Sequence, residues 1–356
     1  MTNFTSAFVT GATGLLGNNL VHSLAARGVR VTALVRSLDK ARKQLRDVPN
    51  LTVVAGDMLD VAGFAARLQN HDVLFHTAAH FRDSYRGGDH HTRLMTINVD
   101  GTRNLMAAAW KAGISRMVHT SSIAVLDGEP GSLIDETCLR SAARADDYYL
   151  SKIRAEHEVL NFLEEHHDFR AVLVLPGWMH GPGDLGPTSA GQIVRDFVRG
   201  KLPGIPPATF SIVDARDVAE AQIAAAQRGR SGERYLAAGR NMTMAELFAI
   251  LQELSSVEAP KVRLPLAFLY VMAAAEELYA RLTGRPVLLS LASVRLLARE
   301  GGRTRFDHRK SEQELGLSFR PVAETLRDEI TWFRAAGILP STGKPEPALV
   351  TVKGAG

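Results

Sequence analysis

Short apolar runs alternate with longer segments of helical periodicity through the first 175 residues. Six of these runs have the length and the β-branched content of buried strands, at residues 6–10, 30–35, 51–56, 72–78, 116–122 and 171–177. Between them, the segments at 15–28, 93–112 and 146–166 place apolar residues three and four positions apart, as on one face of a helix. Buried strands that alternate with helices form parallel sheets. The pattern therefore predicts an α/β fold with a doubly wound parallel sheet.

The pattern changes after Pro176, where a loop rich in Gly and Pro is followed by helical segments and only brief strands. This change predicts a smaller, mostly helical C-terminal lobe packed over the sheet. The expected division is a sheet domain at 1–180, a substrate-binding lobe at 181–340 and a flexible tail at 341–356. The segment at about 208–240 contains two strand-like runs and is a candidate to return to the sheet domain.

Composition and charge narrow the classes of partner and compartment. The formal net charge is +4, a balance that fits an anionic small ligand as well as nucleic acid. Lys and Arg are spread along the chain without a basic run, so we expect no nucleic-acid partner. The single cysteine, Cys138, excludes a disulfide within the chain and favours a reducing compartment. With no signal peptide visible, we expect a cytoplasmic protein.

The most apolar stretch lies at 264–298, and its charge-free part, 264–275, is 12 residues long. Crossing a bilayer takes roughly 20 apolar residues, so we expect no integral membrane segment. A buried or interface-forming helix is the favoured interpretation, and peripheral membrane contact is the alternative.

A glycine-rich turn directly follows the first predicted strand and opens the first predicted helix. Gly11 permits a tight turn, Gly14 lets a pyrophosphate approach the backbone, and Gly17 lets helix and strand pack closely. The helix N-terminus adds N–H donors. The turn predicts a Rossmann-type dinucleotide site whose expected contacts are Gly11, Thr13, Gly14, Leu15, Leu16 and Gly17.

The end of the second strand discriminates between the two dinucleotides. An NAD site commonly has an acidic residue there, but this chain has Val35 followed by Arg36, and Lys40 lies one turn further on. An arginine pairs with the 2′-phosphate that an acid would repel. The sequence therefore predicts NADP (NADPH) as the cofactor, in preference to NAD.

Two adjacent tyrosines precede a lysine in DDYYLSK. Helix geometry places Tyr148, four residues before Lys152, on the lysine's face, whereas Tyr149 is four residues from the apolar Ile153. A cation one turn away lowers the pKa of a phenol and makes it a better acid at neutral pH. Alone, this pair could equally be a surface pair without a role.

Several motifs occur together and in order: TGATGLLG at 10–17, GDMLD at 56–60, HTAA at 76–79, NVDGTRN at 98–104, HTSS at 119–122, YYLSK at 148–152, LPGWMHGPGD at 175–184 and VDARDVA at 213–219. With them the chain resembles the extended short-chain dehydrogenases/reductases (the NAD-dependent epimerase/dehydratase superfamily), and most of all the dihydroflavonol-4-reductase-like branch. The resemblance is firm over about 1–240 and loose over 240–340.

The resemblance implies a role for each matching residue. Tyr148 is the expected general acid, Lys152 lowers its pKa and holds the nicotinamide ribose, and Ser122 hydrogen-bonds the substrate oxygen, in preference to Ser121. The further cofactor positions that it implies are Asp57, Met58, Ala78, Ala79, Asn98, Pro176 and Gly177.

Apolar residues are expected to border the nicotinamide and to bind the substrate: Phe81, Tyr85, Trp178 and Met179. They predict reduction of a carbonyl, or oxidation of an alcohol, on a moderately hydrophobic substrate. The alternatives are a nucleotide-sugar epimerase/dehydratase, a 3β-hydroxysteroid dehydrogenase-like enzyme and, least favoured, a non-catalytic NADP-sensing protein. A homodimer paired through the helix that carries Tyr148 is possible. The histidines match no standard zinc spacing, and we expect no metal.

Overall fold

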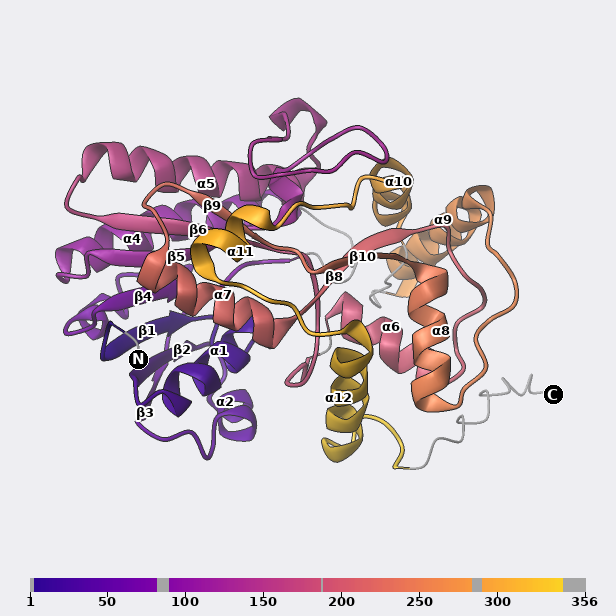
Figure 1. Ribbon diagram of the computed structural model, residues 1–356, viewed down its shortest axis with the longest axis horizontal. Coiled ribbons are helices and arrows are strands. Elements are labelled where there is room, and N and C mark those ends of the chain that lie inside the picture. The colour runs from indigo at the N-terminus through magenta and orange to yellow at the C-terminus, as the bar shows by residue number, and fades with distance from the viewer. Residues whose placement is uncertain (1–2, 82–89, 187, 284–289, 342–356) are drawn as a thin grey trace.

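A parallel sheet of seven strands forms the centre of the computed structural model, which describes residues 3–81, 90–186, 188–283 and 290–341 (Figure 1). Its order is β3-β2-β1-β4-β5-β6-β9. The strands are β1 Ser6–Thr10, β2 Arg30–Val35, β3 Leu51–Ala55, β4 Val73–His76, β5 Arg116–Thr120, β6 Arg170–Pro176 and β9 Arg234–Ala237. The six predicted strands and the doubly wound, Rossmann-type sheet are confirmed. The chain runs outward from β1 to β3 and returns to β4, so the order reverses beside β1, where such sheets bind ligands.

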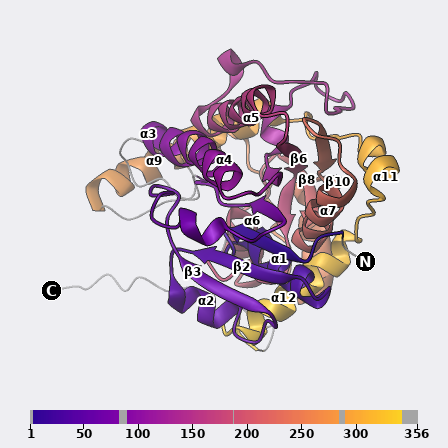
Figure 2. The same ribbon diagram turned by 90° about the vertical axis from the view of Figure 1, so that its left-hand side faces the viewer.

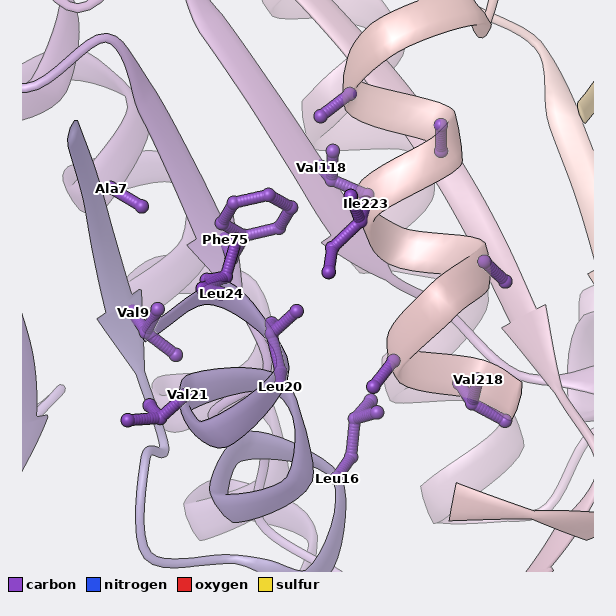
Figure 3. Packing of buried hydrophobic residues seen from close by; sticks show 14 of the residues in the cluster. Ala7, Val9, Leu16, Leu20, Val21, Leu24, Phe75, Val118, Val218 and Ile223 are labelled. Carbon is purple, nitrogen blue, oxygen red and sulfur yellow. The ribbon is translucent and has the colours of Figure 1, made fainter. Parts of the chain in front are cut away.

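Helices cover both faces of this sheet. On one face, α1 (Leu15–Ala26) and α7 (Ala215–Arg228) lie side by side over Val9 and Phe75 (Figure 3). On the other face, α4 (Gly101–Lys111) and α5 (Asp147–Glu165) pack over Phe8 and other buried residues. Because both faces are buried, the inner strands are apolar along nearly their whole length instead of alternating with polar residues. The edge strand β3 is more open, with Thr52, Val53 and Ala55 exposed.

The helix expected at 93–112 is present, but a stretch of π-helical hydrogen bonding that was not predicted lies within it. The segment consists of α3 (His90–Leu94), a π-helical turn η2 (Met95–Asp100) and then α4. Such wide turns are frequent at functional sites. Apolar periodicity did not reveal the turn, because one extra residue in a helical turn changes the spacing very little.

The C-terminal half builds a second sheet of three strands in the order β10-β8-β7. They are β7 Trp178–His180, β8 Thr209–Asp214 and β10 Arg240–Thr243. Strand β7 was not predicted. It follows β6 after one residue, Gly177, whose backbone passes so close to Ala238 and Ser211 that a Cβ would lie 2.3 Å and 2.6 Å from their carbonyl oxygens. Of the segment at 208–240, β9 joins the large sheet and β8 the small one.

The remaining elements are mostly helical, as predicted for the C-terminal half. Around a common apolar cluster lie α6 (Ser189–Val198), α8 (Met244–Ser255) and α12 (Val322–Ala335). The others are α2 (Leu38–Gln44), α9 (Leu266–Thr283), α10 (Leu291–Glu300), α11 (Arg309–Leu315) and the short turns η1 (Ala65–Leu68), η3 (Ile123–Val125) and η4 (Ala142–Arg144). Within the described ranges, each helix is too short or too polar to cross a membrane.

Candidate active site

In the turn between β1 and α1, close packing of the backbone requires glycine at two positions, Gly11 and Gly17, and the third glycine, Gly14, is exposed to solvent. A Cβ on Gly11, whose φ is +66°, would lie 2.7 Å from the backbone nitrogen of Ala78. On Gly17 it would lie 2.3 Å from the carbonyl oxygen of Gly11. Gly14 is exposed, and its Cβ would approach only that same oxygen, at 3.3 Å. Gly14 is also the N-cap of α1 and supplies no side-chain cap. The open backbone at this helix N-terminus fits a pyrophosphate.

Two cations meet just beyond the end of β2. Arg36 is exposed, and Lys40 on α2 is partly buried. Burial lowers the pKa of Lys40, the carboxylate of Asp184 opposes this, and the nearby charge of Arg36 lowers the pKa further. The position where an NAD site places an acid is Val35, which is buried. The end of β2 therefore carries two neighbouring cations and no acidic residue at this position.

The loop after β7 packs on the helices that border this cofactor site, a contact that the sequence did not reveal. The Asn19 amide donates to the carbonyl of Pro182 (2.9 Å), and the Gln44 amide donates to that of Gly183 (2.7 Å). Asp184 is buried, and its carboxylate accepts the backbone N–H of Thr188 at 2.8 Å. Since the same carboxylate acts on Lys40, the C-terminal half contributes to the charge at the end of β2.

Helix α5 brings the proposed acid and its cation under the carboxyl ends of the strands. Tyr148 and Lys152 are four residues apart on this helix, as predicted, and are 9% and 4% exposed. The ammonium of Lys152 donates to the carbonyl of Thr120 at the end of β5, at 3.0 Å. Burial lowers the pKa of Lys152 to about 8, and the charge of Glu156 acts in the opposite direction.

The two serines after β5 have different partners. The Ser121 hydroxyl donates to the buried Glu156 carboxylate at 2.5 Å, and Glu156 also binds Arg234 at 2.7 Å. The half-buried Ser122 hydroxyl accepts the N–H of Ala124 at 3.1 Å, which leaves its proton for another acceptor. Glu156 was missed, although its spacing of four from Lys152 on a helix was a readable signal.

Asn98 in the π-helical turn connects β4 to α5. Its side-chain oxygen accepts the N–H of His80 at 2.7 Å. Its amide nitrogen donates to the carbonyl of His80 and to the hydroxyl of Ser151, both at 3.0 Å. Ser151 in turn donates to the backbone carbonyl of Tyr148 at 2.7 Å. Asn98 thus positions the helix turn that carries Tyr148.

The other expected cofactor residues lie at strand ends around the same edge. Asp57 is half-buried and accepts the N–H of Leu59 at 3.0 Å, and Met58 is buried. Beyond β4, Ala78 is half-buried and Ala79 is exposed; Pro176 ends β6.

The expected substrate residues do not form one surface. The Phe81 ring packs against the proposed acid Tyr148 in a T-shaped arrangement, at 4.6 Å between ring centroids. Trp178 stacks on Phe210 at 4.3 Å in the C-terminal core, whereas Met179, its neighbour in β7, packs against the core under α1 and α7. Tyr85 lies outside the described residues.

Two histidines lie beneath the lysine in neighbouring strands. His76 and His119 are buried, with ring centroids 5.4 Å apart. Burial and the charge of Lys152 lower the pKa of His76 to about 3. Burial, His76 and Lys152 hold the pKa of His119 well below its ordinary value. Within the described part of the chain, neither ring nitrogen of His119 has a hydrogen-bond partner. Both imidazoles are therefore neutral at physiological pH.

Comparisons with known proteins agree with this geometry. Residues 7–238 match the model of the NAD dependent epimerase/dehydratase family. The chain is 34% identical to a dihydroflavonol 4-reductase-like protein of Synechocystis sp., over 93% of this chain and 95% of that protein. It is 33% identical to sterol demethylase protein B of Methylococcus capsulatus, over 94% of this chain and 100% of that protein. The solved structure of gox2253 superposes with a TM-score of 0.80 at 34% identity, over 94% of this chain and 99% of that one. The chain is a member of the NAD dependent epimerase/dehydratase family, in the dihydroflavonol-4-reductase-like branch of the extended short-chain dehydrogenases/reductases.

Proposed function

We propose that the chain is an NADP(H)-dependent reductase of a carbonyl group on a moderately hydrophobic substrate. The observation that carries the proposal is the group formed by Ser122, Tyr148 and Lys152. It combines a hydroxyl with a free proton, a buried phenol and a buried cation at the carboxyl ends of the strands.

A nicotinamide cofactor supplies the hydride when bound, and the side chains handle the proton. Lys152, with a pKa of about 8, is mostly protonated at neutral pH. Its charge favours the phenolate and so makes Tyr148 a stronger acid. Tyr148 then donates its proton to the substrate oxygen, and Ser122 donates a hydrogen bond to the same oxygen.

The preference for NADP is proposed from the end of β2. Arg36 and Lys40 would hold the 2′-phosphate, and the turn at 10–17 would hold the pyrophosphate. Thr13, Leu15 and Leu16 belong to that turn. The nucleotide-binding part is proposed to comprise residues 1–180, and the substrate-binding part 181–340.

The substrate class rests on Phe81, which is 42% exposed beside Tyr148, and on the names of the relatives. One relative is named for dihydroflavonol reduction and another for sterol demethylation. A hydroxysteroid dehydrogenase is therefore the second candidate, and the sterol-related relative favours it.

The test is NADPH oxidation by the purified protein with ketones, aldehydes, flavonoid-like carbonyls and 3-ketosteroids. Tyr148→Phe removes only the phenolic hydroxyl, which carries the acidic proton, and should abolish turnover while NADPH still binds. Tyr149→Phe is the matched control, because the Tyr149 ring lies under the Arg140 guanidinium at 4.7 Å and has no proton-transfer role in the proposal. Turnover that survives in Tyr148→Phe would contradict the proposed function.

A further inference from the structure

Helix α9 presents a continuous apolar face to solvent. Its large exposed side chains are Phe268 (48%), Val271 (69%), Leu278 (59%), Tyr279 (46%) and Leu282 (78%), and the exposed Ala275 lies among them. Spacings of three and four residues place all six on one side of the helix, here called the α9 face. The opposite side of α9 packs against α10.

The buried charge of α9 lies on the side opposite this face. Glu277 is buried, and its carboxylate accepts the N–H of Leu291 on α10 at 2.8 Å. The α9 face extends over about 21 Å, since an α-helix rises 1.5 Å per residue. Figure 2 shows α9 projecting past the neighbouring elements at the side of the molecule. Isolated exposed apolar residues are ordinary, but a contiguous patch marks an interaction site.

Exposed cations occur just before α9 in the chain and on the neighbouring helix α10. Lys261 and Arg263 precede the helix, with Val262, 60% exposed, between them, and Arg295 is exposed on α10. Lys261 pairs with Glu258 at 3.4 Å. Arg263 and Arg295 have no ion-pair partner in the ranges that the structure describes.

We propose that the α9 face binds the surface of a membrane that contains anionic lipids, with α9 lying in the plane of the interface. Apolar residues on one side of a helix and cations beside it are the features of helices that bind lipid surfaces in this way. A second copy of the chain fits less well. A contact through six side chains is small against the roughly 20–30 residues that each partner contributes to a stable interface.

Membrane binding extends the proposed function, because an apolar carbonyl substrate partitions into the bilayer that α9 would contact. The binding itself requires neither cofactor nor turnover. It can therefore be tested separately from the reductase activity.

The test is flotation with vesicles of phosphatidylcholine, with and without phosphatidylglycerol. We expect the wild-type protein to float with the anionic vesicles. The double variant Val271→Glu, Leu278→Glu should lose at least about tenfold in the bound fraction, since it places charges in the apolar face. Leu133→Glu is the matched control, because Leu133 is 52% exposed in a loop far along the chain from α9. Lys261→Ala with Arg263→Ala should weaken binding by about tenfold to anionic vesicles only.

Circular dichroism of each variant establishes that it is folded. Wild-type protein that does not float, or a double variant that floats as well as the wild type, would overturn the proposal. So would light scattering that shows a dimer which the double variant converts to a monomer, because the α9 face would then bind a second copy. Turnover of a water-soluble carbonyl without vesicles reports on the proposed function alone.

Discussion

The hydroxyl of Ser121 donates a 2.5 Å hydrogen bond to the buried carboxylate of Glu156, and this contact separates the roles of two adjacent serines. Glu156 also receives Arg234 and acts on the charge of Lys152. Ser121 is thus part of the support beneath the site, whereas the free proton of Ser122 is available above it.

Substituting each serine by alanine should separate these roles. Ser122→Ala removes the proposed donor to the developing oxyanion and should lower kcat by about 100-fold, with the Kd of NADPH unchanged. Ser121→Ala leaves a buried carboxylate with one donor fewer and should cost about 1–3 kcal/mol of unfolding free energy, with kcat within a few-fold. Steady-state kinetics and urea unfolding measure the two effects. The reverse pattern would assign the substrate contact to Ser121.

The cations Arg36 and Lys40 after β2 predict that a substitution there changes the Kd of NADPH but not that of NADH. Arg36→Ala should raise the Kd of NADPH by about tenfold or more, as expected for a charge-assisted hydrogen bond, and leave that of NADH unchanged. Arg42→Ala, on the helix α2 that follows Arg36, is the matched control, since Arg42 is paired with Asp39 at 2.7 Å. Fluorescence titration measures the Kd of each cofactor for the wild type and both variants. Equal effects on both cofactors would remove the basis for the NADP preference.

Features that depend on local sequence were predictable in this chain. The inner strands were found because burial on both faces of the sheet makes them nearly continuous apolar runs. Gly11 and Gly17 were found because the tight turn between β1 and α1 requires them, and Tyr148 with Lys152 because they share a helix face.

Features that depend on contacts between distant segments were not predictable. Strand β7 exists because Trp178–His180 pairs with β8, some thirty residues later in the chain. The packing of Pro182 and Gly183 on α1 and α2 leaves no local pattern either. In α9, the apolar stretch was interpreted as buried or interface-forming, because composition does not tell which side of a helix meets another element.

The lowered pKa of Lys152 predicts the pH dependence of catalysis. The cation that we propose activates Tyr148 is lost as the pH rises through about 8, so kcat/KM for reduction should fall above that pH. The measurement is a pH profile with saturating NADPH. Constant kcat/KM up to pH 10 would show that the charge of Lys152 is not required.

The same shift has a stability consequence of defined sign. The folded pKa of about 8 lies below the ordinary value of 10.5, so folding disfavours the ammonium form. Below pH 8, burying the ammonium lowers the free energy of unfolding by on the order of 3 kcal/mol. Between pH 8 and pH 10.5 the unfolded chain binds a proton that the folded protein does not, so this loss of stability disappears as the pH rises to 10.5. Lys152→Met should therefore be more stable than the wild type at pH 7, although losing the hydrogen bond to Thr120 makes the gain in stability smaller. The variant should also lose activity. Urea unfolding at pH 7 and pH 10 measures the difference, which should narrow at the higher pH.

The buried histidines predict a loss of stability in acid. The pKa of His76 is about 3 in the folded protein and 6.5 in the unfolded chain, and that of His119 is also lowered. As the pH falls below 6.5, the unfolded state binds protons that the folded state excludes, so the free energy of unfolding decreases. His119→Leu removes two unpartnered ring nitrogens and should raise stability at pH 7 by about 1–3 kcal/mol. The same variant should also make the decrease in the free energy of unfolding between pH 6.5 and pH 4 shallower. The control is His22→Leu, because His22 is exposed. An unchanged acid slope in His119→Leu would mean that His119 is protonated within the folded protein, which its burial beside Lys152 opposes.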